Sequence, residues 1–324
     1  MADLLLGTCH PGRSAYDAMS DVGLNSIRLD VPFPFADRNM SLSDAFKGTS
    51  DWVDEMLEHG FEPLGITPYP EAVPTWRGAP GTEGYFGLVA EAVQFVGEHF
   101  EGKIDVWQCT NEMNVAHFRR PLTPDDAVRF VKESALGLKL ASDYLTVGAN
   151  MGGFSEQAKT MYEQLYESDV SWDYIGTDGY FGTWEEGGPH TWHTALDWLV
   201  ELTPLPVYAM EWGYSSAGKI MPPEKVIPDN TDPHAEGMWC FGWDDDGTVK
   251  SHDFEVQALY IEQTMAILAD RVAGIFYYCW RDSQSCACGN EGCPVEANWG
   301  LVDTNGDPKP SYHALKRCIA ELDD

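Results

Sequence analysis

Long hydrophobic runs are missing from this sequence of 324 residues. No window approaches 18 consecutive apolar residues, so no membrane-spanning helix is expected. The first six residues, Met1 to Leu6, are too few for a secretory signal and lack its basic start. We therefore expect a soluble chain, either a cytoplasmic protein or a mature form whose signal has been removed, and the sequence does not decide between these two.

Basic residues are scarce as well. Only 20 Lys and Arg oppose 52 Asp and Glu, which gives a formal net charge of −32. A field of this sign repels nucleic acid and anionic membrane surfaces, so we expect neither as a partner. The same excess of charge keeps proteins soluble and is one adaptation to high salt. Nothing in the sequence indicates an oligomeric state.

A phosphate-binding loop is also absent from the start of the chain. The segment 7–12 (GTCHPG) has neither the glycine spacing of a dinucleotide site nor the lysine of a P-loop. An enzyme acting on nucleotides is therefore disfavoured.

Apolar and aromatic residues, by contrast, are plentiful. Hydrophobic residues make up 44% of the chain, enough for one substantial core. The 12 Trp, 14 Tyr and 14 Phe exceed what such a core usually needs. Aromatic faces often stack against flat apolar surfaces of ligands.

Short apolar runs alternate with amphipathic stretches along the whole chain, and this order predicts parallel strands joined by helices. Eight such units favour a closed (β/α)8 barrel, here a single domain over residues 1–324. A long segment rich in Pro and Asp, residues 217–253, follows the seventh strand and is expected to shape a ligand site. The predicted strands begin near residues 4, 26, 61, 104, 145, 174, 206 and 272.

Active sites of such barrels lie where the strands end, and two predicted strands end in glutamate. Strand four runs into Asn111 and Glu112, and strand seven runs into Glu211. A carboxylate directly after a buried apolar run needs a partner of opposite charge or has a function, because removing its charge from water is costly. A structural salt bridge explains either glutamate alone, but two of them across one barrel mouth suit retaining glycoside hydrolysis.

In these residues the sequence resembles glycoside hydrolase clan A over its whole length. The resemblance rests on the Asn-Glu pair ending strand four, the lone Glu ending strand seven, and three further positions. These are an arginine on strand two, a tyrosine after strand six and a tryptophan after strand eight, namely Arg28, Tyr180 and Trp280. Together, each at its own strand end, they form a specific pattern.

The resemblance implies a β-glycoside hydrolase that acts by double displacement on an oligo- or polysaccharide. Glu211 would be the nucleophile and Glu112 the acid and base, with the charge of Glu211 favouring a protonated Glu112. Arg28 would lie beneath the nucleophile and Tyr180 would donate a hydrogen bond to it. Asn111 would bind the sugar 2-hydroxyl, with Trp280 beneath the ring. No cofactor is required for this chemistry.

Several alternatives stay open. A transglycosidase would use the same site with a sugar as acceptor, and a catalytically inactive barrel would only bind carbohydrate. A metal-dependent hydrolase is disfavoured, because strand one lacks a His-x-His pair. Within the clan, strand three lacks the histidine common in the large cellulase family, whereas strands six and seven look more like the endo-galactanases. Sugar and linkage stay undetermined.

Tryptophans concentrate in the segments predicted to surround the barrel mouth. Trp184 and Trp212 are the two we expect to contact substrate, because stacking on a sugar face is natural there. For any one tryptophan, packing within the protein is an equal alternative.

Three cysteines lie close together after strand eight: Cys286, Cys288 and Cys293. With Cys240 or His234 from the 217–253 segment they could hold a structural zinc. A disulfide, or free thiols, remain as alternatives. Some clan A β-galactosidases carry a similar zinc, which favours the metal. Such a zinc would link the loop after strand seven to the loop after strand eight without taking part in catalysis.

Overall fold

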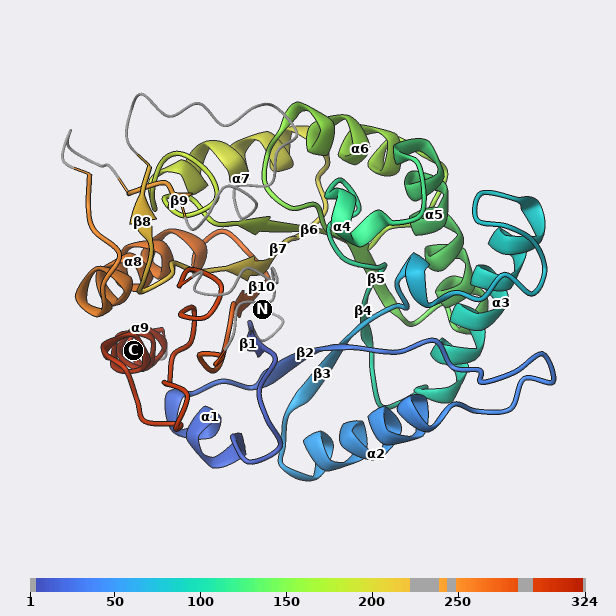
Figure 1. Ribbon diagram of the computed structural model, residues 1–324, viewed down its shortest axis with the longest axis horizontal. Helices are drawn as coiled ribbons and strands as arrows, with labels where there is room; N and C mark the ends of the chain where they lie inside the picture. The colour runs from blue at the N-terminus through green and yellow to red at the C-terminus, as the bar shows by residue number, and fades with distance from the viewer. Residues whose placement is uncertain (1–3, 222–238, 244–248, 285–293, 323–324) are drawn as a thin grey trace. The chain divides into compact units, whose positions relative to one another are not determined.

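The computed structural model describes residues 4–221, 239–243, 249–284 and 294–322. Within these ranges, eight parallel strands form a closed barrel in the order β1-β10-β7-β6-β5-β4-β3-β2, and a helix follows each of them (Figure 1). The predicted (β/α)8 barrel is thus confirmed. The barrel strands are β1 (Leu5–Cys9), β2 (Ser26–Asp30), β3 (Glu62–Ile66), β4 (Val106–Gln108), β5 (Thr146–Ala149), β6 (Tyr174–Gly179), β7 (Val207–Trp212) and β10 (Gly274–Tyr277).

Four helices begin directly after a residue whose side chain caps them. Ser43, Thr123, Ser155 and Asp253 each accept a hydrogen bond from a backbone N–H in the first turn of their helix. The helices are α1 (Tyr16–Val22), α2 (Asp44–Glu58), α3 (Glu83–His99), α4 (Ala116–Arg119), α5 (Pro124–Ala141), α6 (Glu156–Tyr166), α7 (Thr191–Leu202), α8 (Phe254–Leu268) and α9 (Pro310–Ala320), with a 3-10 turn, η1 (Pro70–Ala72).

Large rings fill the interior beside strands that carry glycine. Gly65 pairs with Trp107, and Gly148 pairs with Tyr174, each on the neighbouring strand. A Cβ at either glycine would lie 2.5 Å from the partner's ring, so only glycine leaves room for it. The Tyr174 hydroxyl donates to the Trp107 carbonyl at 3.0 Å.

The chain divides into two compact units. Unit 1 comprises Met1–Leu24, Gly179–Trp198 and Glu211–Asp324, and unit 2 comprises Asn25–Asp178 and Leu199–Met210. The assignment of residues 1–324 to a single domain stays a prediction.

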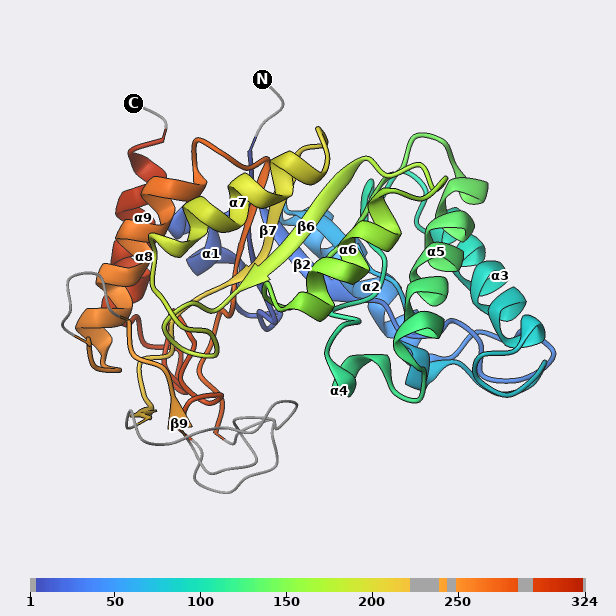
Figure 2. The same ribbon diagram turned by 90° about the horizontal axis from the view of Figure 1, so that it is seen from above.

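In unit 2, α3 and α5 lie side by side in both ribbon views (Figures 1 and 2). Small residues bring them close: a Cβ on Gly137 of α5 would lie 2.6 Å from the Ala90 carbonyl of α3. Arg129 of α5 also contacts α3, with its guanidinium 4.2 Å from the Phe86 ring centre and an ion pair to Glu83. α5 also packs against β5.

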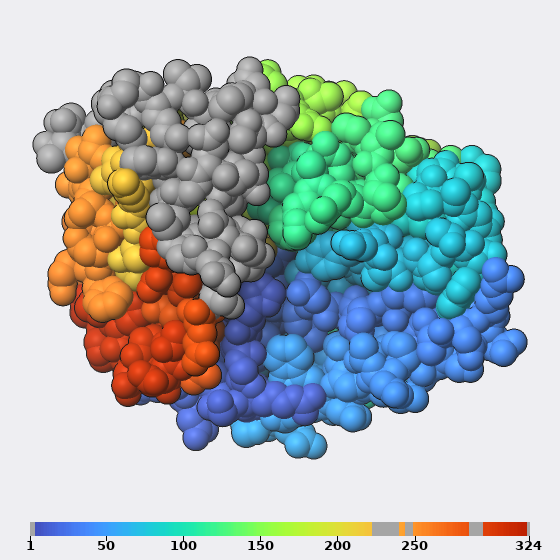
Figure 3. Space-filling view, viewed as in Figure 1, coloured from blue at the N-terminus to red at the C-terminus, as the bar shows by residue number. Residues whose placement is uncertain are grey.

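In unit 1, α8 and α9 pack against each other, and their atoms adjoin on the surface in orange and red (Figure 3). α1 ends at Gly23, whose φ of +95° places it in the left-handed region that glycine adopts without strain. A Cβ there would also come within 2.7 Å of Ile319 on α9. A hydrogen bond also joins α1 and α9: the Tyr312 hydroxyl of α9 donates to Asp21 of α1 at 2.8 Å.

The predicted segment 217–253 contains a short parallel sheet made of β8 (Lys219–Ile220) and β9 (Trp239–Cys240). It ends at Asp253, the N-cap of α8. Residues 222–238 and 244–248 lie outside the described residues, and the loop's part in a ligand site stays a prediction. Within the described ranges, no helix combines the length and the hydropathy that crossing a membrane requires.

Candidate active site

The turn after β4 carries two of the predicted residues, Asn111 and Glu112. The strand is shorter than expected and ends at Gln108, since the backbone leaves the extended conformation at Thr110 and Glu112, whose φ angles are +61° and +44°. Non-glycine residues rarely adopt this left-handed conformation, and they cluster at functional sites where they do. Thr67 holds the turn, because its Oγ1 accepts a hydrogen bond from the Thr110 backbone N–H at 2.9 Å.

Six buried polar side chains of unit 2 form what we call the Glu112 cluster: Arg28, Gln108, Asn111, Glu112, Asn150 and Asp178. Asn111 is its centre. The Oδ1 of Asn111 accepts hydrogen bonds from Arg28 at 2.6 Å, from Asn150 at 2.8 Å and from Gln108 at 3.1 Å. No described residue accepts a hydrogen bond from the Asn111 Nδ2, so this NH2 group can donate to a ligand.

Glu112 is held both at its backbone and at its carboxylate. Its N–H donates to the Oδ1 of Asn150 at 3.2 Å. Its carboxylate lies against Gly152, where an added Cβ would come within 2.5 Å of Oε1. Asn114 fixes Gly152 through two hydrogen bonds of 2.8 and 2.9 Å. The absence of a side chain at residue 152 is therefore what makes room for the Glu112 carboxylate.

A second carboxylate lies beside Glu112. Oxygens of Glu112 and Asp178 are within 4.8 Å of each other, and both residues are buried. Two buried carboxylates at this separation resist ionising together, so one of them is favoured in its protonated form. Asp178 accepts a hydrogen bond from Asn150 at 2.6 Å, which stabilises its charged form.

Three members of the Glu112 cluster were not predicted: Gln108, Asn150 and Asp178. Each is a polar residue at or next to the end of a barrel strand, the same signal that led to the two glutamates. Gln108 donates to Asn150 at 2.8 Å and accepts from Arg28 at 2.9 Å. Arg28 lies in the middle of β2 rather than at its end, and the contacts described for it in unit 2 are to Gln108 and Asn111.

The second predicted glutamate lies within unit 1. Glu211 is the fifth residue of β7 and only 6% exposed. Tyr180 directly follows β6, and its hydroxyl donates a hydrogen bond to the Oε2 of Glu211. A hydroxyl that donates to a carboxylate oxygen stabilises negative charge there. The hydrogen bond predicted between these two residues is present.

Around Glu211, unit 1 gathers what we call the Glu211 cluster: Tyr180, Trp184, Glu211, Tyr278, Glu296 and Trp299. Trp299 is buried at its base, with ring centres 5.0 Å from Tyr180 and 6.3 Å from Trp184. Tyr278 meets Tyr180 edge-on at 5.8 Å. The indole N–H of Trp184 donates to Glu296 at 2.9 Å. These contacts join four aromatic rings and the Glu296 carboxylate into one group, and Tyr180 links that group to Glu211.

Two predicted substrate-binding tryptophans are largely covered. Trp212 ends β7 and is fully buried, edge-on to Tyr277 with ring centres 5.2 Å apart. It lies in the strand and not in a loop, because β7 extends two residues beyond its predicted end. Trp280 is 3% exposed and meets Tyr312 edge-on. Trp184, in contrast, is only half-buried and keeps exposed surface.

The predicted metal ligands fall mostly outside the described residues. Cys286, Cys288, Cys293 and His234 all do so. Cys240 is described: it is buried on β9, and its Sγ lies 3.5 Å from the Lys219 carbonyl of β8. A structural zinc at these cysteines stays a prediction.

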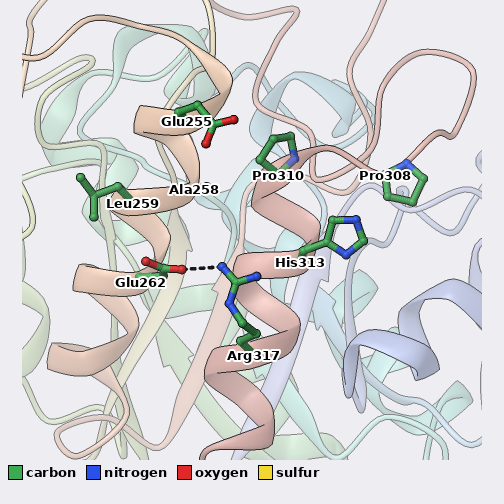
Figure 4. A pocket seen from close by; sticks show the side chains of 8 residues that line it. All are labelled: Glu255, Ala258, Leu259, Glu262, Pro308, Pro310, His313 and Arg317. Atoms are coloured by element: carbon green, nitrogen blue, oxygen red, sulfur yellow. Dashed lines mark hydrogen bonds and ion pairs between the residues drawn. The ribbon is translucent and has the colours of Figure 1, made fainter.

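A surface groove of about 550 Å³ lies between α8 and α9 on the helical face of unit 1 (Figure 4). An ion pair between Glu262 and Arg317 crosses it at 2.6 Å. None of the residues predicted to act on a sugar lines it. Its walls are helix side chains, whereas barrel enzymes bind substrate at the loops that follow the strands, so we do not assign the active site here.

The sequence was compared with family models and with curated proteins. No family model matches the chain. It is 23% identical over 353 aligned positions to a β-xylosidase of Caldicellulosiruptor saccharolyticus, covering 96% of this chain and 66% of that protein. The chain therefore spans just under two thirds of the curated relative it matches.

Solved structures share the fold. A family 39 glycoside hydrolase from Bacteroides cellulosilyticus WH2 matches with a TM-score of 0.66 and 18% identity, over 98% of this chain and 64% of that one. The GH53 catalytic domain of Ignisphaera aggregans matches with a TM-score of 0.66 and 19% identity, over 98% and 96%. The predicted resemblance to the clan A barrel glycosidases is thus confirmed, and the proteins that this chain resembles are glycoside hydrolases.

Proposed function

We propose that this clan A-like barrel hydrolyses β-glycosidic bonds by double displacement, with Glu211 as nucleophile and Glu112 as acid and base. One observation carries the proposal: both glutamates are buried, Glu211 near the end of β7 and Glu112 in the turn after β4, and each lies in its own polar cluster. Tyr180 donates a hydrogen bond to Glu211, whereas Glu112 lies beside the carboxylate of Asp178. Retention further requires that the two carboxyls lie about 5–5.5 Å apart.

In the first step, an oxygen of Glu211 attacks the anomeric carbon while the bond from that carbon to the leaving oxygen breaks. The proton of Glu112 passes to the leaving oxygen, and a covalent glycosyl-enzyme forms. In the second step, Glu112 takes a proton from water, and the water oxygen displaces Glu211 from the same carbon. The anomeric configuration is therefore retained.

Asn111 serves both steps as a donor. Three hydrogen bonds fix its carbonyl oxygen, so its NH2 group has one orientation. A donor held in this way can bind the sugar 2-hydroxyl, a contact that strengthens in the transition state.

Kinetics with different leaving groups test the two roles. Wild type, Glu211→Ala and Glu112→Ala are assayed on 4-nitrophenyl and 2,4-dinitrophenyl β-glycosides of xylose, glucose, galactose, mannose and fucose. Xylosides belong in this panel because the curated relative is named a β-xylosidase. Glu211→Ala should lose turnover of every substrate, since no covalent intermediate can form.

Glu112→Ala should distinguish the two leaving groups. Dinitrophenolate leaves without protonation, so that glycoside should still form the intermediate, whereas the 4-nitrophenyl glycoside should react far more slowly. Proton NMR of the first-formed product should show the β-anomer. Near-normal turnover by Glu211→Ala, or an α-anomer from the wild type, would refute the proposal. Products longer than the substrate would instead indicate transglycosylation.

A further inference from the structure

Asn150 directly follows β5, and its side chain links the ends of the two neighbouring strands. β5 pairs with β4 on one side and with β6 on the other. The buried carboxamide of Asn150 forms hydrogen bonds with Gln108 of β4 and with Asp178 of β6. The backbone of β6 also approaches it closely, since a Cβ on Gly176 would lie 3.3 Å from the Asn150 Cβ. Residues on both neighbouring strands therefore fix the position of this side chain.

The partners of Asn150 allow only one orientation of its carboxamide. The backbone N–H of Glu112 can only donate, so the Asn150 atom that it meets at 3.2 Å is the oxygen Oδ1. The Gln108 amide donates to the same oxygen at 2.8 Å. The NH2 group then faces two acceptors, Oδ2 of Asp178 at 2.6 Å and Oδ1 of Asn111 at 2.8 Å. A flipped amide would place its NH2 group against the Glu112 N–H.

This orientation also determines that of Asn111. Because Asn150 presents a donor, Asn111 turns its oxygen towards it, and the Asn111 NH2 group lies on the other side. Arg28 donates to the same Asn111 oxygen at 2.6 Å and favours the same orientation. A continuous set of hydrogen bonds thus runs from the Glu112 backbone through Asn150 to the amide that we assign to the sugar 2-hydroxyl.

The backbone that Asn150 holds is strained. Glu112 has a φ of +44°, a conformation that costs free energy in any residue except glycine. Such a conformation persists where surrounding contacts hold the residue in place. The Asn150 oxygen provides one of these contacts, because it accepts a hydrogen bond from the Glu112 N–H. When this contact is lost, the turn can relax, and the Glu112 carboxylate moves with its backbone.

We propose that Asn150 is a positioning residue for both steps of the reaction: its oxygen holds the turn that carries Glu112, and its NH2 group orients Asn111. The inference rests on the proposed function for the roles of Glu112 and Asn111. Asn150 acts through these neighbours, because hydrogen bonds within unit 2 fill all four hydrogen-bonding positions of its side chain.

Asn150→Ala removes all four hydrogen bonds and is assayed on the 4-nitrophenyl and 2,4-dinitrophenyl β-glycosides of the panel sugars. A misplaced Glu112 protonates the leaving oxygen poorly, so kcat/KM for the 4-nitrophenyl glycoside should fall by about 100-fold or more. The dinitrophenyl glycoside needs no proton and should lose only about tenfold, which is the part due to Asn111. A variant that only folded less well would lose the same factor on both substrates.

Asn150→Asp has nearly the same shape and separates the two sides of the carboxamide. It keeps an oxygen towards Gln108 and Glu112, but the NH2 group becomes an oxygen. That oxygen faces Asn111 and Asp178, and burial beside a second carboxylate should raise the pKa of the introduced carboxyl. The carboxyl can donate one hydrogen bond while it is protonated and none once it is ionised. Activity relative to the wild type should therefore fall by about tenfold or more between pH 5 and pH 9.

Two controls separate positioning from general effects. Asn39→Asp makes the same chemical change at an exposed residue of unit 2 and should match the wild type at every pH. Asn150→Ala introduces no titratable group, so its activity relative to the wild type should not change with pH. Circular dichroism melting reports whether each variant folds. Where Asn150→Ala does not fold, the pH profile of Asn150→Asp carries the test.

Each outcome decides one proposal. If the wild type cleaves glycosides but Asn150→Ala lowers both substrates by equal factors, or if Asn150→Asp has the pH profile of the wild type, the positioning role is refuted and the proposed function stands. If the wild type cleaves no glycoside, the proposed function fails, and crystal structures of the wild type and Asn150→Ala decide. A Glu112 turn that loses its left-handed φ, or an Asn111 amide that moves, supports positioning. An unchanged turn and amide refute it.

Discussion

The hydroxyl of Tyr180 donates a hydrogen bond to the Oε2 of Glu211. If that bond stabilises the attacking carboxylate, Tyr180→Phe should lower kcat/KM on an aryl β-glycoside by roughly 10- to 100-fold, since hydrogen bonds to charged groups contribute most. Its ring remains in contact with Trp299, so thermal stability should change little. Steady-state kinetics measure the effect beside Tyr144→Phe, which removes a hydroxyl from a side chain that is 94% exposed, and equal rates in both variants would contradict it.

Single residues also show which positions a sequence pattern can single out and which it cannot. Asn111, Glu112 and Glu211 were predicted because a polar residue that ends an apolar run stands out in the sequence. Asn150, Asp178, Tyr278 and Glu296 were not. Their importance comes from partners far along the chain, such as the 112 positions that separate Trp184 from Glu296. Trp212 shows the converse: its aromatic ring predicted a ligand contact, but the strand continues through it and buries the ring.

At the scale of elements, the segment after β5 supports the turn after β4. Gly152→Ala places a Cβ where the Oε1 of Glu112 now lies, so the carboxylate must move. We expect kcat to fall at least tenfold, whereas the melting temperature should fall by only a few degrees, because a flexible side chain yields more readily than backbone.

Gly87→Ala is the matched control for this change. Residue 87 is exposed on α3, and a Cβ there meets nothing within 4 Å. Alanine should stabilise that helix by about 0.5–1 kcal/mol and leave kcat unchanged. Equal kcat values for Gly152→Ala and wild type would show that Glu112 does not need its present position.

In the segment before α8, His252 packs against residues from two other parts of unit 1. Its ring stacks on Tyr214 at 4.4 Å, with Nδ1 2.9 Å from the Ser215 carbonyl oxygen and Nε2 2.6 Å from that of Phe241. Burial lowers the pKa of His252, although both carbonyls act to raise it. Below about pH 6.5 the unfolded chain therefore binds a proton that the folded protein does not, and the free energy of unfolding falls as pH falls.

His252→Gln keeps one amide donor but cannot titrate. Urea unfolding of both proteins at pH 7.5 and 5.5 measures the difference, which should be at most about 1.4 kcal/mol for each pH unit. Wild type should lose more stability than His252→Gln over this interval. An equal loss in both would mean that His252 does not couple folding to pH.

Element boundaries were predictable only in part. Apolar runs located all eight barrel strands, because a strand covered on both faces must be apolar throughout. They did not show that β4 spans only Val106–Gln108, since the left-handed residues that end it have ordinary side chains. The short sheet of β8 and β9 was missed, because two residues in each strand form no pattern.

For the molecule as a whole, the negative net charge determines how we expect stability to depend on salt. With 52 acidic and 20 basic residues, the folded chain repels itself, and salt screens that repulsion. The melting temperature should therefore rise by several degrees between 0.1 and 1 M NaCl at pH 7. Near the isoelectric point the same salt step should have little effect. A melting temperature that is flat or falling with salt at pH 7 would show that self-repulsion is not a main cost.

The central claim is that Glu211 becomes covalently attached to the sugar, and trapping tests it most directly. The wild type is incubated with 2,4-dinitrophenyl 2-deoxy-2-fluoro-β-glycosides of the panel sugars, whose fluorine slows the second step. Intact mass spectrometry should show one added sugar, peptide mapping should place it on Glu211, and Glu211→Ala should show none. A sugar on another residue, or an enzyme that turns over glycosides yet never traps one, would contradict the account.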